Sequence, residues 1–225
     1  MKKEIHIFFV GGAGDKERFA IIKKFPILGW GPTNIVGDYV NHFQQKLAAL
    51  KLNNHYQVNY FSYLEKKSLL LKLAALNKQN TTKQIFVAIV GHSYGASLAY
   101  RASKESQQII DLLITIDPVG AGRSSFLKNW LLSSNMITKK SNINQWEMVW
   151  PSSLIFLKSN FVALVGGAWR NHKKLTKFAA KNCSTMIKAG DKSIYHDNFY
   201  GLMRYPQKGL SMEDILLNKI VAFSK

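Results

Sequence analysis

The sequence has only one cysteine among its 225 residues, Cys183. A single thiol excludes an internal disulfide, so packing and hydrogen bonds alone must hold the fold together. We expect Cys183 to pack as a small apolar side chain rather than to react. Apolar residues make up 47% of the chain, which is enough for a sizeable core. The length fits one domain better than two, and we predict a single domain over residues 1–225.

Acidic residues are also scarce: 13 Asp and Glu stand against 31 Lys and Arg, which gives a formal net charge of +18. Only five of the basic residues are arginine. Bidentate reading of bases favours arginine, so the composition does not predict sequence-specific nucleic-acid binding. The lysines are spread along the chain. They fit either a solvated surface or contact with an anionic partner such as an acidic membrane.

A long uninterrupted apolar run is absent. The start "MKKEIHIFFVGG" resembles a signal peptide superficially, but Glu4 intrudes and the apolar run of residues 5–10 is short. A later apolar stretch, residues 154–169, is broken by Lys158 and Asn160. We therefore expect no membrane anchor and a cytoplasmic location by default, with export by a specialised route left open.

Cofactor motifs are absent as well. The glycine-rich "VGGAGD" of residues 10–15 lacks the G-K-[ST] ending of a phosphate loop and the third glycine of a dinucleotide fingerprint. The histidines and acids show no zinc-like spacing. We predict that the chain uses neither a cofactor nor a metal.

What is present is an alternation of strand and helix patterns. Continuous apolar runs predict strands over 5–10, 56–61, 84–90 and 109–117. Helical periodicity predicts helices over 32–52, 64–78 and 94–106. Two further candidate strands are 146–150 and 183–188. This order predicts an α/β protein with a mostly parallel, doubly wound sheet. Ligands bind such sheets at the carboxyl ends of the strands, where Gly11 to Asp15, Gly91 to Gly95 and Asp117-Pro118 fall. We also expect a helix over 16–25, capped by Asp15.

The segment Gly91-His92-Ser93-Tyr94-Gly95 has the form G-x-S-x-G, with a predicted strand before it and a predicted helix after it. A nucleophile on so sharp a turn needs small residues two positions before and two positions after it, because the backbone there is strained. The alternative is a Gly/Ser turn with no chemistry.

The stretch "IFVAIVGHSYGASLAY" resembles the nucleophile elbow of the α/β-hydrolases, and G-H-S-x-G is frequent among lipases and esterases. The resemblance covers residues 4–120 well. It implies a short version of that fold, without the amino-terminal strands, and a candidate lid insertion at about 121–182. It further implies acyl-ester chemistry through a triad in the chain order serine, acid, histidine, with Ser93 as the nucleophile.

Asp117 is the favoured acid, because it ends the strand beside the elbow strand and the next candidate strand has no carboxylate at its end. An ordinary Asp-Pro turn is the alternative. Asp111 stands at the opposite end of the same strand, and Asp191 is the second choice. His196 is the favoured base, since it lies in a loop after the last strand. His172 is disfavoured by the basic segment 170–174, whose charge opposes an imidazolium.

The other histidines precede the acid in the chain; these are His6, His42, His55 and His92. We expect His92 to pack below the site. For the oxyanion hole, the resemblance implies the backbone N–H of Tyr94 together with that of Gly12 or Ala13.

The region between Asp117 and His196 contains Trp130, Trp146, Trp150 and Trp169. Tryptophan together with lysine is typical of a membrane interface. Residues 152–169 fit either a lid or a core helix. We predict a serine hydrolase that acts on lipid or other apolar esters, with contact to an anionic membrane. A thioesterase or acyltransferase on the same triad and an inactive binding module are the alternatives, and the oligomeric state is left open.

Overall fold

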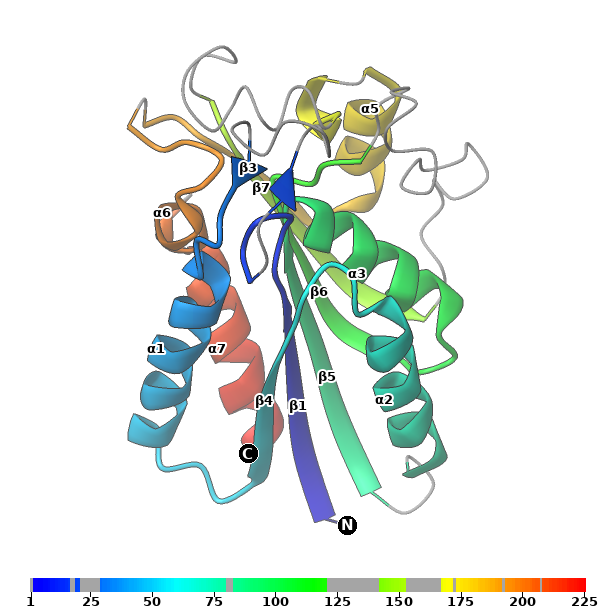
Figure 1. Cartoon of the computed structure of the whole chain (residues 1–225). Helices are drawn as coiled ribbons and strands as arrows, with labels where there is room; N and C mark the ends of the chain where they lie inside the picture. Colours follow the sequence, from blue (N-terminus) through cyan, green and yellow to red (C-terminus); the bar gives the residue numbers. More distant parts are fainter. Residues whose placement is uncertain are drawn as a thin grey trace.

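A computed structural model describes residues 2–16, 19–20, 29–79, 83–120, 142–152, 167–171, 173–191, 193–206 and 208–225. Six parallel strands form one sheet in the order β4-β1-β5-β6-β7-β8 (Figure 1). Their bounds are β1 Lys2–Val10, β4 His55–Phe61, β5 Lys83–His92, β6 Ile110–Ile116, β7 Ile143–Pro151 and β8 Thr185–Ala189. The predicted parallel sheet is therefore confirmed.

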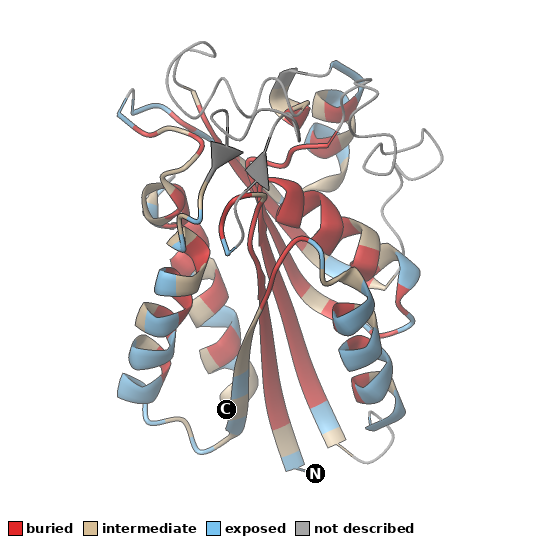
Figure 2. Ribbon diagram, viewed as in Figure 1, coloured by how far each residue is buried: buried red, intermediate tan, exposed pale blue. Residues whose placement is uncertain are grey.

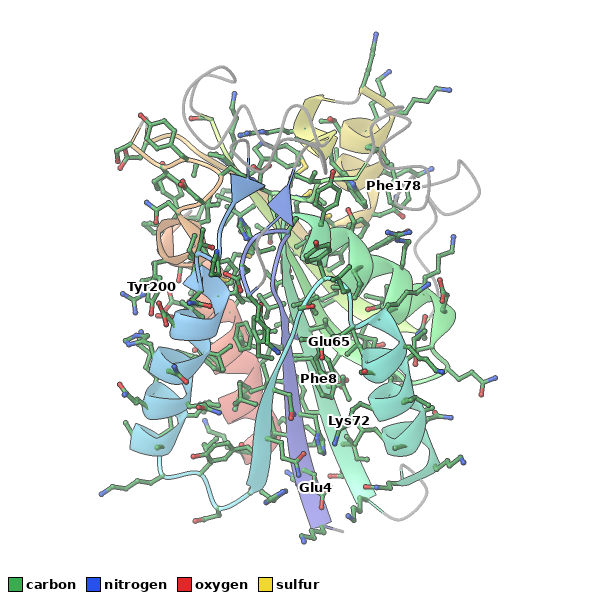
Figure 3. All side chains as sticks on the ribbon, in the orientation of Figure 1. Glu4, Phe8, Glu65, Lys72, Phe178 and Tyr200 are labelled. Atoms are coloured by element: carbon green, nitrogen blue, oxygen red, sulfur yellow. The ribbon has the colours of Figure 1, made fainter. Side chains whose placement is uncertain are left out.

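Helices cover both faces of this sheet (Figure 1). One face carries α1 Ile35–Ala49, α6 Phe199–Arg204 and α7 Met212–Ser224; the other carries α2 Lys66–Gln79, α3 Tyr94–Glu105 and α5 Lys173–Asn182. Figure 3 shows the labelled Tyr200 and Phe178 on opposite sides of the strands, as expected for members of two separate layers.

The alternation along β1 explains why both faces are covered. Ile5, Ile7 and Phe9 pack toward the layer of α1, α6 and α7, whereas Phe8 and Val10 pack toward α2 and α3. Successive side chains of a strand point to opposite faces, so a strand that is apolar at nearly every position needs a layer on each side. Figure 2 shows the resulting buried centre of the sheet. Each such side chain contributes about 1.5–3 kcal/mol when it is fully buried.

The strand order reverses at β1, which places the candidate site. The chain moves from β1 outward to the edge strand β4, then returns to the other side of β1 as β5. At such a reversal the connections leave in opposite directions and open a crevice at the carboxyl ends of the strands. The residues that follow β1 and β5 are Gly11, Gly12 and Ser93, so the two glycine-rich turns meet there.

The helix expected over 16–25 is wrong where the structure describes it. Phe19–Ala20 form a short strand, β2, antiparallel to β3 Gly29–Trp30; residues 17–18 and 21–28 lie outside the described residues. Asp15 instead caps α1, because its Oδ1 accepts a hydrogen bond of 3.0 Å from the backbone N–H of Val36. The carboxylate thus meets a helix that begins twenty positions further on.

The range 121–182, predicted as a candidate lid, contains parts of the sheet and its covering layer. β7 pairs with β6, and α5 packs Leu175 and Ala179 against the sheet. Residues 121–141 and 153–166, which include Trp130 and most of the segment 152–169, lie outside the described residues. Within the part of the chain that the structure describes, no helix has the length and apolar character needed to cross a bilayer.

Candidate active site

Ser93 stands on a strained turn between β5 and α3. Its backbone angles are φ 56° and ψ −125°, outside the regions that side-chain-bearing residues prefer. The turn is tight enough to exclude a side chain at both flanking glycines. A Cβ on Gly91 would lie 2.6 Å from Ala96 Cα, and one on Gly95 would lie 2.3 Å from the carbonyl oxygen of Val10. The G-x-S-x-G spacing is therefore a steric requirement of this turn.

Hydrogen bonds from neighbouring elements hold the turn in this conformation. The Ser93 N–H donates to the carbonyl of Ile116 at 3.0 Å, and the Ser93 carbonyl accepts from the N–H groups of Ala96 and Val119 at 3.1 Å each. Because these partners come from the ends of β6 and α3, the surrounding structure over-determines the strained residue.

The structure brings the three predicted triad side chains into one row. His196 lies in the loop between β8 and α6, and its Nε2 is 2.8 Å from Ser93 Oγ. Its Nδ1 is 2.8 Å from Asp117 Oδ2. All three residues are buried, and Asp117 is fully so. The imidazole therefore bridges a hydroxyl and a carboxylate that belong to adjacent strand ends.

Asp117 is held at the end of β6 in an unusual conformation of its own. Its φ is +40°, and its N–H donates to the carbonyl of Val149 at 2.8 Å. A positive φ is uncommon for a residue other than glycine, although Asp tolerates it better than most. The turn directs the carboxylate away from the strand and toward the loop that carries His196.

The other candidates lie elsewhere. Asp111 is the second residue of β6, near the amino end of that strand, and its Oδ2 accepts from the N–H of Val87 at 2.9 Å. The Oδ1 of Asp191 accepts from the N–H and hydroxyl of Ser193, on the surface. His6 is within β1 and His42 within α1. His172 lies outside the described residues.

The loop after β1 lies against the nucleophile. A Cβ on Gly12 would stand 2.7 Å from Ser93 Cβ and 3.3 Å from Ser93 Oγ, so only glycine allows this approach. Ala13 packs beside Tyr63, Tyr94, Val119 and Ala168, which we call the apolar cluster. Tyr94 is the first residue of α3, where the N–H groups point out of the helix. Of the three residues predicted for the oxyanion hole, Gly12 thus lies against Ser93, Tyr94 follows Ser93 in the chain, and Ala13 packs beside the cluster that contains Tyr94.

His92 takes the position expected for it, below the site. Its ring centroid lies 4.9 Å from that of His196 and 5.5 Å from that of Phe199. Its Nε2 is 2.7 Å from the backbone carbonyl of His196, which can only accept. Burial, and to a smaller extent the nearby His196 ring, lower the pKa of His92 to about 4. His92 is therefore neutral near pH 7, with the proton on Nε2.

Two polar contacts of the site were not anticipated. Tyr60, from β4, donates to Asp15 Oδ2 at 2.7 Å and so anchors the loop after β1. Arg170, from the short 3₁₀ helix η4 Trp169–Asn171, has its Nη2 3.4 Å from Asp117 Oδ2. The sequence offered no signal for Tyr60. For Arg170 the only signal in the sequence is its place in the basic segment 170–174, which indicates positive charge but not a contact with Asp117.

Three of the tryptophans invoked for a membrane interface are in the core. Trp146 and Trp169 are 0% and 1% exposed, and Trp150 is also buried. Trp146 and Trp169 pack with Tyr100 and Phe178 in an aromatic group whose ring centroids are 5.0–6.3 Å apart. This part of the expectation is wrong, because local composition does not reveal which rings the sheet and α5 enclose. In the described ranges, no three His, Cys, Asp or Glu side chains gather closely enough to hold a metal ion.

Comparison with known proteins finds likeness in structure but not in sequence. No family model matches the chain, and no curated protein matches it. A protein of Xanthomonas campestris pv. campestris assigned to the α/β hydrolase superfamily superposes with a TM-score of 0.51 at 10% identity, over 96% of this chain and 98% of that one. A YdeN-like protein of Pectobacterium atrosepticum gives 0.48 at 13% identity, over 98% and 91%. The peroxisomal α/β-hydrolase Lpx1 of Saccharomyces cerevisiae gives 0.45 at 10%, over 99% and 85%. The parallel sheet, the helical layers on both of its faces and the first of these structural similarities together show that the chain has the fold of the α/β-hydrolase superfamily.

Proposed function

We propose that this protein is a serine hydrolase that cleaves carboxylic esters through a covalent acyl-enzyme. The observation that carries the proposal is the continuous row from Ser93 Oγ through the His196 imidazole to Asp117 Oδ2, with 2.8 Å at each step. A serine hydroxyl is a weak nucleophile unless a base takes its proton, and this base needs a partner that sets its tautomer.

The proton positions follow from the donors and acceptors. An ionised carboxylate only accepts, so Nδ1 of His196 carries a proton and donates to Asp117. Nε2 then has its lone pair free for the hydroxyl proton of Ser93. As Oγ bonds to the acyl carbon, that proton passes to Nε2 and then to the departing alcohol. Water completes the cycle by the same route in reverse, which releases the acid and restores the serine.

Negative charge on the carbonyl oxygen would be met by backbone N–H groups. The first turn of α3 offers that of Tyr94, and the positive end of the helix dipole favours an anion there. The loop after β1 offers that of Gly12 or Ala13. One such donor is worth about 3 kcal/mol in the transition state.

The apolar cluster supports an ester with an apolar acyl group. Ala13 and Tyr94 are among the residues whose backbone N–H groups are the proposed oxyanion donors, and the Val119 N–H donates to the Ser93 carbonyl. Apolar walls bind an acyl chain through the surface that they remove from water. A thioesterase or acyltransferase would use the same three residues, because other residues select the leaving group and the acceptor.

The test is to label the pure protein with a fluorophosphonate and to assay p-nitrophenyl esters of short and long acyl chains. We expect labelling of the wild type and none of Ser93→Ala. Ester turnover should fall by about 10⁴ or more in Ser93→Ala, His196→Ala and Asp117→Asn. Wild-type protein that neither reacts with the probe nor turns over any ester would instead support an inactive binding module.

We further propose that the enzyme works at an anionic membrane surface, with α5 as its contact. Residues 167–190 contain five lysines and no acid. Lys173, Lys174, Lys177 and Lys181 are exposed along α5, while Leu175 and Ala179 are buried beneath them. The helix lies at the end of the sheet where the candidate site is found (Figure 1). Each lysine near an anionic bilayer contributes roughly 1 kcal/mol.

Liposome sedimentation tests this surface. We expect binding to vesicles containing phosphatidylserine, little binding to neutral vesicles, and at least a tenfold loss on Lys173→Glu with Lys177→Glu. The control of equal charge is Lys72→Glu with Lys78→Glu, whose side chains are exposed on a different helix, α2. Equal loss in both variants would mean that net charge rather than α5 drives binding. Negligible binding to every vesicle would remove the idea.

A further inference from the structure

Arg170 is a buried cation beside the carboxylate of the site. Its side chain is only 7% exposed. Nη1 donates to the carbonyl of Pro151 at 2.7 Å, and Nη2 lies 3.4 Å from Asp117 Oδ2. The guanidinium therefore connects the end of β7 to the residue that ends β6. It reaches the site from η4, which stands outside the sheet.

Asp117 needs such a partner. The carboxylate is fully buried, and its Oδ1 has no hydrogen-bond partner among the described residues. Its other oxygen receives one bond, from the His196 ring. An ionised carboxylate out of contact with water is strongly destabilised unless a cation or several donors face it. A neutral imidazole supplies one donor and no charge.

We propose that Arg170 is a positioning residue, which keeps Asp117 ionised and directed at His196 while the imidazole is neutral. This inference rests on the proposed function. During the reaction the imidazole gains a proton and becomes a second cation on the same carboxylate oxygen. Arg170 thus stabilises the state in which Asp117 is ionised and His196 is neutral. For the same reason it opposes protonation of His196.

The two effects predict a distinctive change when the guanidinium is removed. Asp117 and the neutral His196 ring together have one negative charge, and a proton added to either of them neutralises it. A nearby cation disfavours that proton wherever it resides. In Arg170→Gln we therefore expect the acidic limb of the pH–rate profile to move to higher pH. A residue with a merely structural role would lower the rate at every pH and leave the position of the acidic limb unchanged.

Two measurements test the proposal. The first is the pH profile of kcat/KM with a p-nitrophenyl ester for wild type, Arg170→Lys and Arg170→Gln. We expect Arg170→Gln to lose at least tenfold in kcat, with KM within twofold and the acidic limb shifted upward. Arg170→Lys retains the charge but lacks the second nitrogen, so its rate should be intermediate and its acidic limb close to wild type. Arg101→Gln, on α3, is the matched control and should leave the profile unchanged.

The second measurement does not depend on turnover. NMR titration of the His196 ring carbon-bound protons should show a higher midpoint in Arg170→Gln than in wild type. An unshifted midpoint together with an unshifted acidic limb overturns the role of Arg170, even if the enzyme hydrolyses esters. A shifted midpoint in a protein that hydrolyses nothing leaves the electrostatic coupling intact and removes only the proposed function. If Arg170→Gln does not fold, Arg170→Met decides, because it removes the charge and retains the apolar part of the side chain: a wild-type rate together with an unshifted acidic limb would overturn the proposal.

Discussion

The Nε2 of His92 lies 2.7 Å from the backbone carbonyl oxygen of His196. The residue that precedes the proposed nucleophile thus fixes the main chain of the residue whose ring faces that nucleophile. Because a carbonyl accepts and a neutral imidazole has one N–H, this contact requires the Nε2 tautomer of His92. The alignment of Ser93, His196 and Asp117 therefore depends on a fourth side chain, that of His92, which holds the backbone of His196.

His92 makes stability depend on pH in a defined window. Burial lowers its pKa to about 4 in the folded protein, against about 6.5 in an unfolded chain. The unfolded state binds the extra proton first, so this stabilisation is complete above about pH 6.5 and is lost as the pH falls toward 4. We expect about 2–3 kcal/mol to be lost between pH 7 and 4.5, measured by urea unfolding.

The matched variant is His92→Gln, which retains an amide donor and cannot titrate. Its unfolding free energy should fall less over the same window. His92→Leu should lose about 1–3 kcal/mol at pH 7, since it leaves the His196 carbonyl buried and unpaired. Identical pH dependence in wild type and His92→Gln would contradict this account.

Gly12→Ala should impair catalysis while the protein stays folded. The added Cβ would lie 2.7 Å from Ser93 Cβ, so either the loop or the serine must shift. A displacement of this kind misaligns the hydroxyl and the oxyanion donors, and we expect kcat/KM to fall by about a hundredfold. Gly37→Ala in α1 is the control, because its Cβ meets no atom within 4 Å. It should retain activity and gain up to about 1 kcal/mol in stability.

Thr115→Val should destabilise the core without touching the site. Trp146 Nε1 donates to Thr115 Oγ1 at 3.0 Å, and both residues are fully buried. Valine has nearly the same shape but accepts no hydrogen bond, so the indole N–H loses this partner. We expect a loss of about 1–3 kcal/mol in urea unfolding. In a double-mutant cycle with Trp146→Phe the two effects should be less than additive; strict additivity would show that the bond contributes nothing.

Glu213 should supply stability that disappears in acid. Burial tends to raise its pKa, but hydrogen bonds from Lys46 and Tyr39 and the charge of Arg204 hold that pKa below its usual range. A lowered carboxyl pKa means stabilisation that is present above about pH 4.3 and lost as the pH falls further. Glu213→Gln should therefore be about 1–2 kcal/mol less stable than wild type at pH 7 and indistinguishable from it at pH 2.5. A constant difference across this range would argue for packing instead.

The strands, the elbow and the order of Ser93, Asp117 and His196 could be predicted because each leaves a local trace. A strand buried on both faces must be apolar at nearly every position, as in residues 84–90. A strained turn packed against a neighbouring strand needs glycine at fixed offsets, as at Gly91 and Gly95. A carboxylate directly after an apolar strand, such as Asp117, is placed at the functional edge by the direction of the sheet.

The sequence by itself thus determined the architecture, and it predicted the three side chains that the structure places within hydrogen-bond distance of one another. Only the tertiary structure decided the partners of these residues: Val36 for Asp15, the His196 carbonyl for His92, and Arg170 for Asp117. It also decided that Trp146 and Trp169 lie inside the protein. These contacts join segments far apart in the chain, and they arise from how the layers pack on the sheet. The periodicity, spacing and composition of a short stretch of sequence therefore do not predict such contacts.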